Sequence, residues 1–201
     1  MTGLRALQRQ RVREAISSAA IRLFLERGFD EVPVTEVAAA AGVSKPTLFK
    51  YFPTKEDLVL HRIADHEGEP ARVVRRREPG QAPLAALRRH FLDGLARHDP
   101  VTGLNDHPEV LSYHRMVFGT PSLAARVLHY MAADERSLAE ALAETTDELT
   151  ACLQAAQVLA VQRVLAHRNW QALADGVPLA ELEPEAVRAA GRAYTLVTGG
   201  S

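Results

Sequence analysis

The stretch from Val34 to Leu58 constrains the fold most, because two short helix signals are separated there by a single tight turn. Thr35 is expected to cap a helix of small residues with high helix propensity that runs to Ala41. Gly42 then supplies the left-handed backbone conformation that commonly ends a helix. Since no long loop fits between the two signals, the stretch predicts a pair of short helices joined by a turn.

The second helix of this pair is predicted to run from about Lys45 to Phe52. Ser44 can cap its first turn, and Pro46 falls inside that turn, where a missing backbone N–H costs nothing. Leu48 lies one helical turn before Phe52, so the two side chains are expected to share the inward face.

The outward face of this helix carries an aromatic side chain among cations and hydroxyls, which is unusual for a merely solvated surface. Apolar side chains there can contact thymine methyl groups, and lysine, threonine or tyrosine can contact base edges and phosphates. Thr54 is expected to cap a further helix that begins at Lys55, and a helix start is a good location for a phosphate. The residues predicted to bind DNA are Thr35, Ser44, Lys45, Pro46, Thr47, Phe49, Lys50, Tyr51 and Lys55. The alternative is an ordinary helical hairpin with Phe49 packed in a core.

The segment AGVSKPTLFKYFPTKEDLV resembles the DNA-binding signature of the TetR family of bacterial transcriptional regulators, and the resemblance extends over about Val12 to Asp65. It rests on several features at fixed offsets: the short helix, the Ala-Gly-Val turn, the Tyr-Phe pair and the Lys-Glu before an apolar run. One departure is Phe49, where a tyrosine is often found. The resemblance implies a fourth helix that links head to body, dimerisation through the C-terminal helices, and release from DNA by a small molecule.

Two arginine-rich segments lie outside this stretch. The first 22 residues contain Arg5, Arg9, Arg11, Arg13 and Arg22 against a single carboxylate, Glu14. A basic arm beside a DNA-contacting helix fits phosphate binding, although each arginine could equally lie on a solvated face. The run from Arg72 to Arg77 could be a second phosphate contact, but a solvated linker face is the more economical interpretation.

The whole chain is expected to be all-α, with about nine helices, because apolar residues recur at helical spacing and no alternating strand pattern occurs. Residues 1–60 are expected to form a three-helix DNA-binding head, and residues 61–201 a larger helical body for ligand binding and dimerisation. Gly68 and Pro70 predict a break in the helix that follows Lys55. The final helix is predicted from about Glu185 to Val197.

Composition excludes several classes of protein. With 47% apolar and 24% charged residues the chain is globular, no run approaches 18 consecutive apolar residues, and no secretory signal is evident, so a cytoplasmic protein without membrane contact is expected. The single cysteine, Cys152, is expected to be a buried structural thiol. The eight histidines form no i, i+4 pair with carboxylates, and no nucleophile or phosphate-loop motif occurs, so neither a metal, a cofactor nor an enzymatic activity is expected.

A small-molecule pocket is expected in the body, where histidines and aromatic residues lie on helices predicted to surround its interior. The candidate residues are His90, Phe91, Tyr113, His114, Met116, His129, Tyr130 and Met131. The same residues could instead be simple core.

A homodimer is expected because one short helix covers too few base pairs for specificity, so two heads must share a palindromic operator. Its interface is predicted on the last two helices, at Leu149, Leu153, Ala156, Leu159, Ala160, Val187, Ala190 and Tyr194. These residues could instead pack only within one body.

The sequence thus predicts a sequence-specific DNA-binding transcriptional regulator. The family resemblance adds that it is a repressor released from its operator when an unidentified small molecule binds the conformation with low operator affinity. The alternative is a ligand-independent architectural DNA-binding protein, which a body without a cavity would favour.

Overall fold

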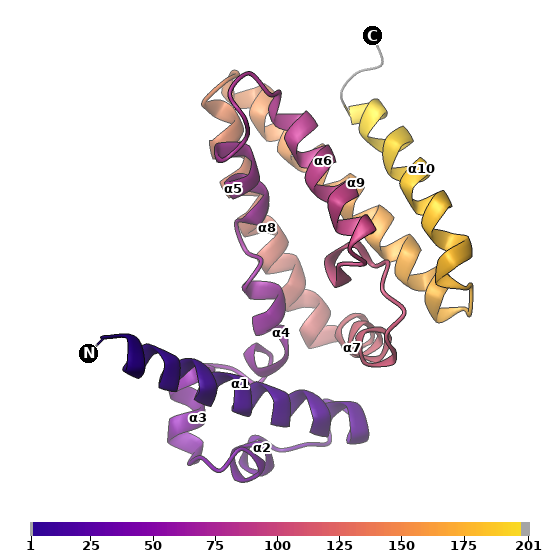
Figure 1. Ribbon diagram of the computed structural model, residues 1–201. Helices are drawn as coiled ribbons and strands as arrows, with labels where there is room; N and C mark the ends of the chain where they lie inside the picture. Colours follow the sequence, from indigo (N-terminus) through magenta and orange to yellow (C-terminus); the bar gives the residue numbers. More distant parts are fainter. Residues whose placement is uncertain (1, 198–201) are drawn as a thin grey trace. The chain divides into compact units, whose positions relative to one another are not determined.

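The computed structural model describes residues 2–197, and the side chains of residue 3 and of residues 6–197 (Figure 1). Within this part of the chain there are ten α-helices, one short 3-10 helix and no strand, which confirms the all-α class. The helices are α1 (Thr2–Arg27), α2 (Val34–Ala40), α3 (Lys45–Tyr51), α4 (Asp57–Ala64), α5 (Glu69–Arg75), α6 (Pro83–Ala96), η1 (Pro100–Thr102), α7 (Pro108–Gly119), α8 (Pro121–Ala143), α9 (Glu148–Ala174) and α10 (Leu179–Val197).

The chain divides into two compact units. The first contains the residues up to Asp65 together with Ser112–Leu128, and the second contains His66–Leu111 and the residues from His129 onward. The sequence places a boundary near residue 60 and assigns everything beyond it to the body. It therefore did not anticipate that most of α7 and the start of α8 group with the N-terminal helices.

In the first unit, α1 lies across α2 and α3 and also packs against α4 (Figure 1). Ile16 and Phe24 of α1, Leu48 of α3, Phe52 after it and Leu58 of α4 are at most 1% exposed and form the centre of this unit. Burial of such side chains contributes roughly 1.5–3 kcal/mol each. This core holds α3 so that its other face remains at the surface.

Two features of the turn between α2 and α3 match the sequence prediction. Gly42 adopts a φ of +67°, a backbone conformation that is strained for any residue with a side chain. The glycine is needed for this conformation and not for space, because a Cβ there would meet no atom within 4 Å. Ser44 caps α3, because its Oγ accepts a hydrogen bond from the Thr47 N–H at 3.2 Å.

Two helix starts differ from the prediction. Thr35 does not cap α2: the cap position is Pro33, and Thr35 lies inside the first turn. The helix expected from Lys55 begins instead at Asp57, because Thr54 and Asp57 exchange side-chain-to-backbone hydrogen bonds at 3.0 and 3.2 Å and leave the two residues between them in a turn.

The predicted break after α4 is confirmed. Gly68 has a φ of +72°, and its N–H donates to the Asp134 carboxylate at 2.6 Å. Burial raises the pKa of Asp134, and this backbone hydrogen bond opposes the rise. The single helix expected from Lys55 onward is therefore two helices, α4 and α5.

The run from Arg72 to Arg77 is largely engaged within the second unit. Arg72 donates to the Glu67 carbonyl at 2.7 Å, Arg75 pairs with Glu144 at 3.3 Å, and Arg77 donates to the Val74 carbonyl at 2.6 Å. These contacts stabilise α5 and its connections, and they favour a structural role over a second DNA contact.

In the second unit, α9 and α10 lie side by side, and α6 packs against α10 (Figure 1). The apolar core includes Leu87, Leu95, Leu138, Val158 and Tyr194, each fully buried. The loop after η1 reaches α9 at Gly103, whose φ is +70° and where a Cβ would lie 1.9 Å from the Ala166 carbonyl oxygen. The buried Asn169 side chain donates to the Thr102 carbonyl at 3.0 Å, which fixes the same contact.

Helix α10 begins six residues earlier than predicted and continues through Pro184. The predicted start at about Glu185 lies just after this proline, which removes one helical hydrogen bond. Leu182, which is buried among core residues, offsets that loss.

By length and composition alone, α9 could cross a membrane, although no run of 18 apolar residues occurs in the sequence. Only 22% of its most apolar stretch is buried within the described structure. Leu149, Leu153 and Val164 of this helix are more than half exposed in the single chain.

Candidate nucleic-acid interface

The exposed face of α3 carries the side chains predicted to contact DNA. Phe49 is 37% exposed, Lys45, Pro46 and Lys50 are exposed, and Leu48 on the opposite face is fully buried. The Lys45 ammonium lies 6.0 Å from the centroid of the Phe49 ring. Phe49 is thus held at the surface beside a cation, which argues against the alternative in which it packs in a core.

The two hydroxyl groups near the start of α3 are hydrogen-bonded to each other. The Ser44 and Thr47 hydroxyl oxygens lie 2.8 Å apart, and Thr47 is half-buried. Their capping role fixes the first turn of α3, and each hydroxyl retains further hydrogen-bonding capacity. Thr35 is exposed on α2, although it is not the cap of that helix.

Lys55 lies in the turn before α4 and contacts the core of the first unit. Its ammonium group lies 4.6 Å from the centroid of the Phe29 ring and 5.5 Å from that of Phe24, and it donates to the Asp30 carbonyl at 3.4 Å. These contacts restrain an otherwise flexible side chain, so its position is largely set before any ligand arrives.

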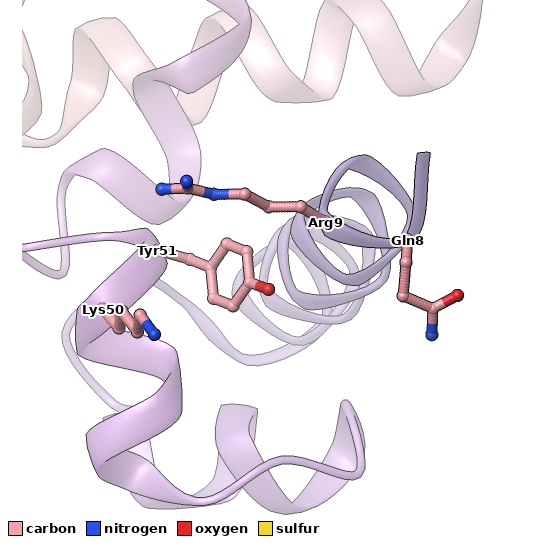
Figure 2. Close-up of a pocket in the computed structure, with 4 residues that line it drawn as sticks. All are labelled: Gln8, Arg9, Lys50 and Tyr51. Atoms are coloured by element: carbon pink, nitrogen blue, oxygen red, sulfur yellow. The ribbon is translucent and has the colours of Figure 1, made fainter. Parts of the chain in front are cut away.

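An open pocket of about 240 Å³ lies between α1 and α3 and is lined by Gln8, Arg9, Lys50 and Tyr51. Figure 2 shows the Tyr51 ring between the Arg9 guanidinium and the Lys50 ammonium, with the hydroxyl directed toward the α1 side. The Arg9 guanidinium carbon lies 5.9 Å from the centroid of the ring. Sequence reasoning did not identify Gln8, and it placed Arg9 only among five basic residues, because helical spacing alone does not say which side of α1 faces α3.

Other arginines of α1 are engaged elsewhere. Arg13 pairs with Asp65 at 3.3 Å and lies over the Phe52 ring, and Arg22 pairs with Glu26 at 3.4 Å. The side chain of Arg5 lies outside the described residues. The basic arm inferred from the sequence is therefore not uniform, and Arg9 is the member that lines a pocket with α3.

The residues predicted to bind a small molecule are not brought together in one unit. Tyr113, His114 and Met116 belong to the first unit, where the Tyr113 hydroxyl donates to the Val59 carbonyl at 2.9 Å and burial raises the Tyr113 pKa. The remaining five belong to the second unit.

Within the second unit, three of those five differ from the expected pocket lining. His129 is exposed, and His90 lies at the surface, where its Nε2 is 3.3 Å from Glu69. Phe91 packs in the core with its ring centroid 6.2 Å from that of Tyr194. Tyr130 and Met131 are half-buried and are the members still available to line a pocket.

The predicted dimer surface on α9 is exposed in the single chain, where Leu149 is 69% and Leu153 is 54% exposed. Cys152 between them is exposed as well, so the expectation of a buried thiol was wrong. The expectation rested on the apolar helical pattern around Cys152, which does not show which face of the helix the rest of the chain covers. Ala156, Leu159 and Ala160 are half-buried.

On α10 the dimer prediction requires a correction. Val187 is 43% exposed, but Ala190 and Tyr194 are fully buried in the core of their own chain. The Tyr194 hydroxyl accepts from the Gln162 amide at 2.8 Å, and burial raises its pKa to about 12. Helical spacing identified the apolar side of α10 correctly but could not show that α6 and α9 cover it.

Comparison with known proteins agrees with this arrangement. The model of the family described as "Bacterial regulatory proteins, tetR family" matches residues 16–61. TcmR of Streptomyces glaucescens, an HTH-type transcriptional regulator, is 29% identical over 180 residues, which cover 86% of this chain and 79% of TcmR. RutR of Escherichia coli strain K12, also an HTH-type transcriptional regulator, is 38% identical over 93 residues, which cover 45% of this chain and 42% of RutR.

The fold is also found among solved structures. NalD of Pseudomonas aeruginosa, the secondary repressor of the MexAB-OprM multidrug efflux pump, superposes with a TM-score of 0.62 at 18% identity, and the match covers 92% of this chain and 96% of NalD. This likeness shows that the whole chain, and not its first unit alone, shares the fold of NalD. The chain is thus a DNA-binding transcriptional regulator whose residues 16–61 match the TetR family of bacterial regulatory proteins.

Proposed function

We propose that this protein is a repressor that binds a palindromic operator as a homodimer in the cytoplasm and leaves it when a small molecule binds the body. The observation that carries the proposal is the outward face of α3, where Lys45, Phe49 and Lys50 are exposed while Leu48 anchors the helix inside. A repressor is favoured over an architectural protein because NalD, which shares the fold, is described as a repressor. Its relatives are named as regulators, so we propose no enzymatic activity.

We assign specificity to Lys45, Thr47 and Phe49, and general affinity to the other predicted contacts. The first three lie on the part of α3 that can enter a major groove, where a good bidentate contact discriminates by about 1–3 kcal/mol and a methyl contact by less. The predicted contacts Thr35, Ser44, Lys50, Tyr51 and Lys55 surround them and would position the helix on phosphates, and Pro46 would contact a thymine methyl group.

The test is selection of duplexes from a random-sequence pool, first by the wild-type protein and then by a variant with Lys45, Thr47 and Phe49 all replaced by alanine. The wild type should enrich a palindrome, and the triple variant should lose that preference while retaining non-specific binding. Arg188→Ala, at an exposed position of α10, is the control and should enrich the same palindrome. If the triple variant keeps the wild-type preference, α3 is not the helix that recognises sequence.

The second copy is proposed to cover the exposed apolar face of α9, at Leu149, Leu153 and Ala156, with Val187 of α10 beside it. Two-fold symmetry is the simplest arrangement that presents two heads to a palindrome. This surface also gives a physical reason for the length and apolar character of α9 that does not require a membrane.

The effector is proposed to bind in the second unit, with Tyr130 and Met131 as the remaining candidate contacts. A ligand can lower operator affinity only if it binds the low-affinity conformation more tightly than the DNA-bound one. Screening small molecules for release of the selected duplex tests this step. If Tyr130→Ala and Met131→Ala respond to an active compound as the wild type does, the ligand binds elsewhere.

A further inference from the structure

Two cations from helices far apart in the sequence meet at the pocket between α1 and α3. Arg9 comes from the third turn of α1 and Lys50 from the end of α3, and the Tyr51 ring lies between their charged groups (Figure 2). Among the described residues neither cation forms an ion pair. The one carboxylate among the first 22 residues, Glu14, accepts a hydrogen bond from Gln10 at 2.8 Å.

The groups that line this pocket are the donors an anion requires. The Arg9 guanidinium, the Lys50 ammonium, the Gln8 amide and the Tyr51 hydroxyl can all donate hydrogen bonds. The Tyr51 ring supports the Arg9 guanidinium from one side, which orders a long side chain before a ligand binds. An open pocket with two uncompensated cations therefore favours a phosphate group.

The position of the pocket identifies which phosphate group it fits. Lys50 directly follows Phe49 and belongs to the exposed face of α3, which is about 10 Å long at 1.5 Å per residue. The major groove is about 12 Å wide, so when the middle of α3 reaches base edges, its C-terminal end lies beside the sugar-phosphate backbone.

We propose that Gln8 and Arg9 of α1 complete, with Lys50 and Tyr51 of α3, a binding site for one backbone phosphate of the DNA. This inference rests on the proposed function, because it assumes that the exposed face of α3 enters the groove. It makes α1, which otherwise supports the helix pair, a part of the DNA-binding surface. Arg9 binds without regard to sequence, since a phosphate contact positions the protein and does not read bases.

The experiment measures how the affinity of the full-length protein for a random-sequence duplex changes between 50 and 200 mM salt. Each neutralised phosphate contributes about 0.9 to the slope of log affinity against log salt, so one contact corresponds to about a threefold loss over this range. Arg9→Gln should lower the slope by about 0.9 for each head on the duplex. Arg9→Lys should retain the slope, and Gln8→Ala should weaken binding without changing it.

The matched control is Arg22→Gln, which removes the same charge from the same helix but from an arginine already paired with Glu26. It should leave the slope close to that of the wild type. Equal slopes for Arg9→Gln and Arg22→Gln would overturn the proposal, and so would a changed sequence preference in Arg9→Gln.

Two further outcomes separate the possible failures. If the wild-type protein itself does not bind DNA, the proposed function fails. If the wild type binds DNA and Arg9→Gln binds with the same affinity and salt slope, only the proposed phosphate site on α1 is refuted. The pocket could also serve a free anion, which phosphorus NMR line broadening of inorganic phosphate would detect. Loss of that broadening in Arg9→Gln with unchanged DNA binding would likewise overturn the proposal.

Discussion

At the scale of single residues, the ammonium group of Lys55 has both a structural and a proposed binding role. It lies over the rings of Phe29 and Phe24, which are buried in the first unit, and it remains partly exposed. A cation–π contact of this kind contributes roughly 0.5–1 kcal/mol at a partly exposed site. The same restraint keeps the charge where a phosphate can reach it.

We therefore expect Lys55→Ala to weaken binding to every DNA sequence by a similar factor and to lower the salt slope by about 0.9 per head. The free energy of unfolding should fall by about 0.5–1 kcal/mol because the contact with the two rings is lost. Binding titrations at several salt concentrations and urea unfolding measure the two effects. An altered preferred sequence would contradict the assignment of Lys55 to a phosphate.

Tyr51→Phe retains the ring beside Arg9 and removes only the hydroxyl. Binding to all sequences should weaken slightly and equally, and the salt slope should stay unchanged because no charge is lost. The same titrations test this expectation. A slope as low as that of Arg9→Gln would show that the hydroxyl, and not the ring, holds Arg9 in place.

At the scale of helices, the contact between α1 and α4 contains a histidine whose pKa depends on folding. His61 lies with its Nδ1 3.1 Å from the buried Ser17 hydroxyl, and its ring packs edge-on to Phe52 at 5.6 Å. Burial lowers the pKa of His61 to about 4; Arg13 and Arg62 add to the shift, and Asp65 opposes it. The folded protein thus keeps His61 neutral at pH values where the unfolded chain takes up a proton.

The free energy of unfolding should consequently fall as the pH drops from about 6.5 to about 4, by on the order of 2 kcal/mol from this group. His61→Gln retains hydrogen-bonding capacity toward Ser17 but does not titrate, so its stability should depend less on pH over that window. Urea unfolding followed by circular dichroism at pH 7 and pH 4.5 compares the two. His129→Gln, at an exposed position, should behave as the wild type, and equal pH dependence in all three proteins would refute the role of His61.

The close approach of the η1 loop to α9 offers a second test at this scale. Gly103→Ala would place a Cβ 1.9 Å from the Ala166 carbonyl oxygen, so the loop must leave α9 and the Asn169 hydrogen bond must break. We expect a loss of about 3–5 kcal/mol, measured by urea unfolding with the fluorescence of the single tryptophan, Trp170, on the same helix.

Gly80→Ala is the matched control for this substitution. Gly80 has a similar φ of +81°, but a Cβ there would meet no atom within 4 Å. Its cost should be limited to the left-handed conformation, about 1–2 kcal/mol. Equal losses at the two glycines would show that the contact with Ala166 contributes nothing.

The helices themselves illustrate what sequence can predict. Gly42, Ser44 and the Gly68–Pro70 break act within a few residues of their own positions, so their effects follow from local chemistry. Thr54 was correctly predicted to form hydrogen bonds in the turn before α4. The helix starts two residues later than predicted because Thr54 and Asp57 each bond the other's backbone N–H, which holds the residues between them in a turn. The early start of α10 depends on burial of Leu182, which no local pattern around Pro184 reveals.

The candidate site shows the same limit. Helical spacing correctly predicted that Leu48 is buried and Phe49 exposed, because both lie on one short helix. Helical spacing could not predict the contact between Arg9 and Tyr51, which are 42 positions apart in the sequence. It also could not show that Tyr194 is covered by other helices of its own chain. Relations within one element are therefore predictable, whereas relations between elements require the structure.

At the scale of the whole molecule, the exposed apolar face of α9 is the feature that a second copy would cover. Leu153→Glu combined with Ala156→Glu should yield folded monomers, because a buried unpaired carboxylate in a dimer interface costs several kcal/mol. Monomers should bind a half-site weakly, since affinity then comes from one head. Sedimentation and operator titration measure the two effects.

Val101→Glu is the control for this double variant, since Val101 is 55% exposed on η1 and lies outside the proposed surface. It should remain dimeric. Intact dimers of the folded double variant would remove α9 from the interface.

The exposure of Cys152 has a practical consequence. It is the single cysteine of the sequence and stands between Leu149 and Leu153 on α9, so one thiol reagent modifies each chain at one known atom. If a second copy covers this face, the reagent reacts only with dissociated chains, and the rate of modification then reports their fraction. The rate of thiol modification in the unaltered protein therefore measures dissociation of the dimer, and it can be followed at concentrations too low for sedimentation.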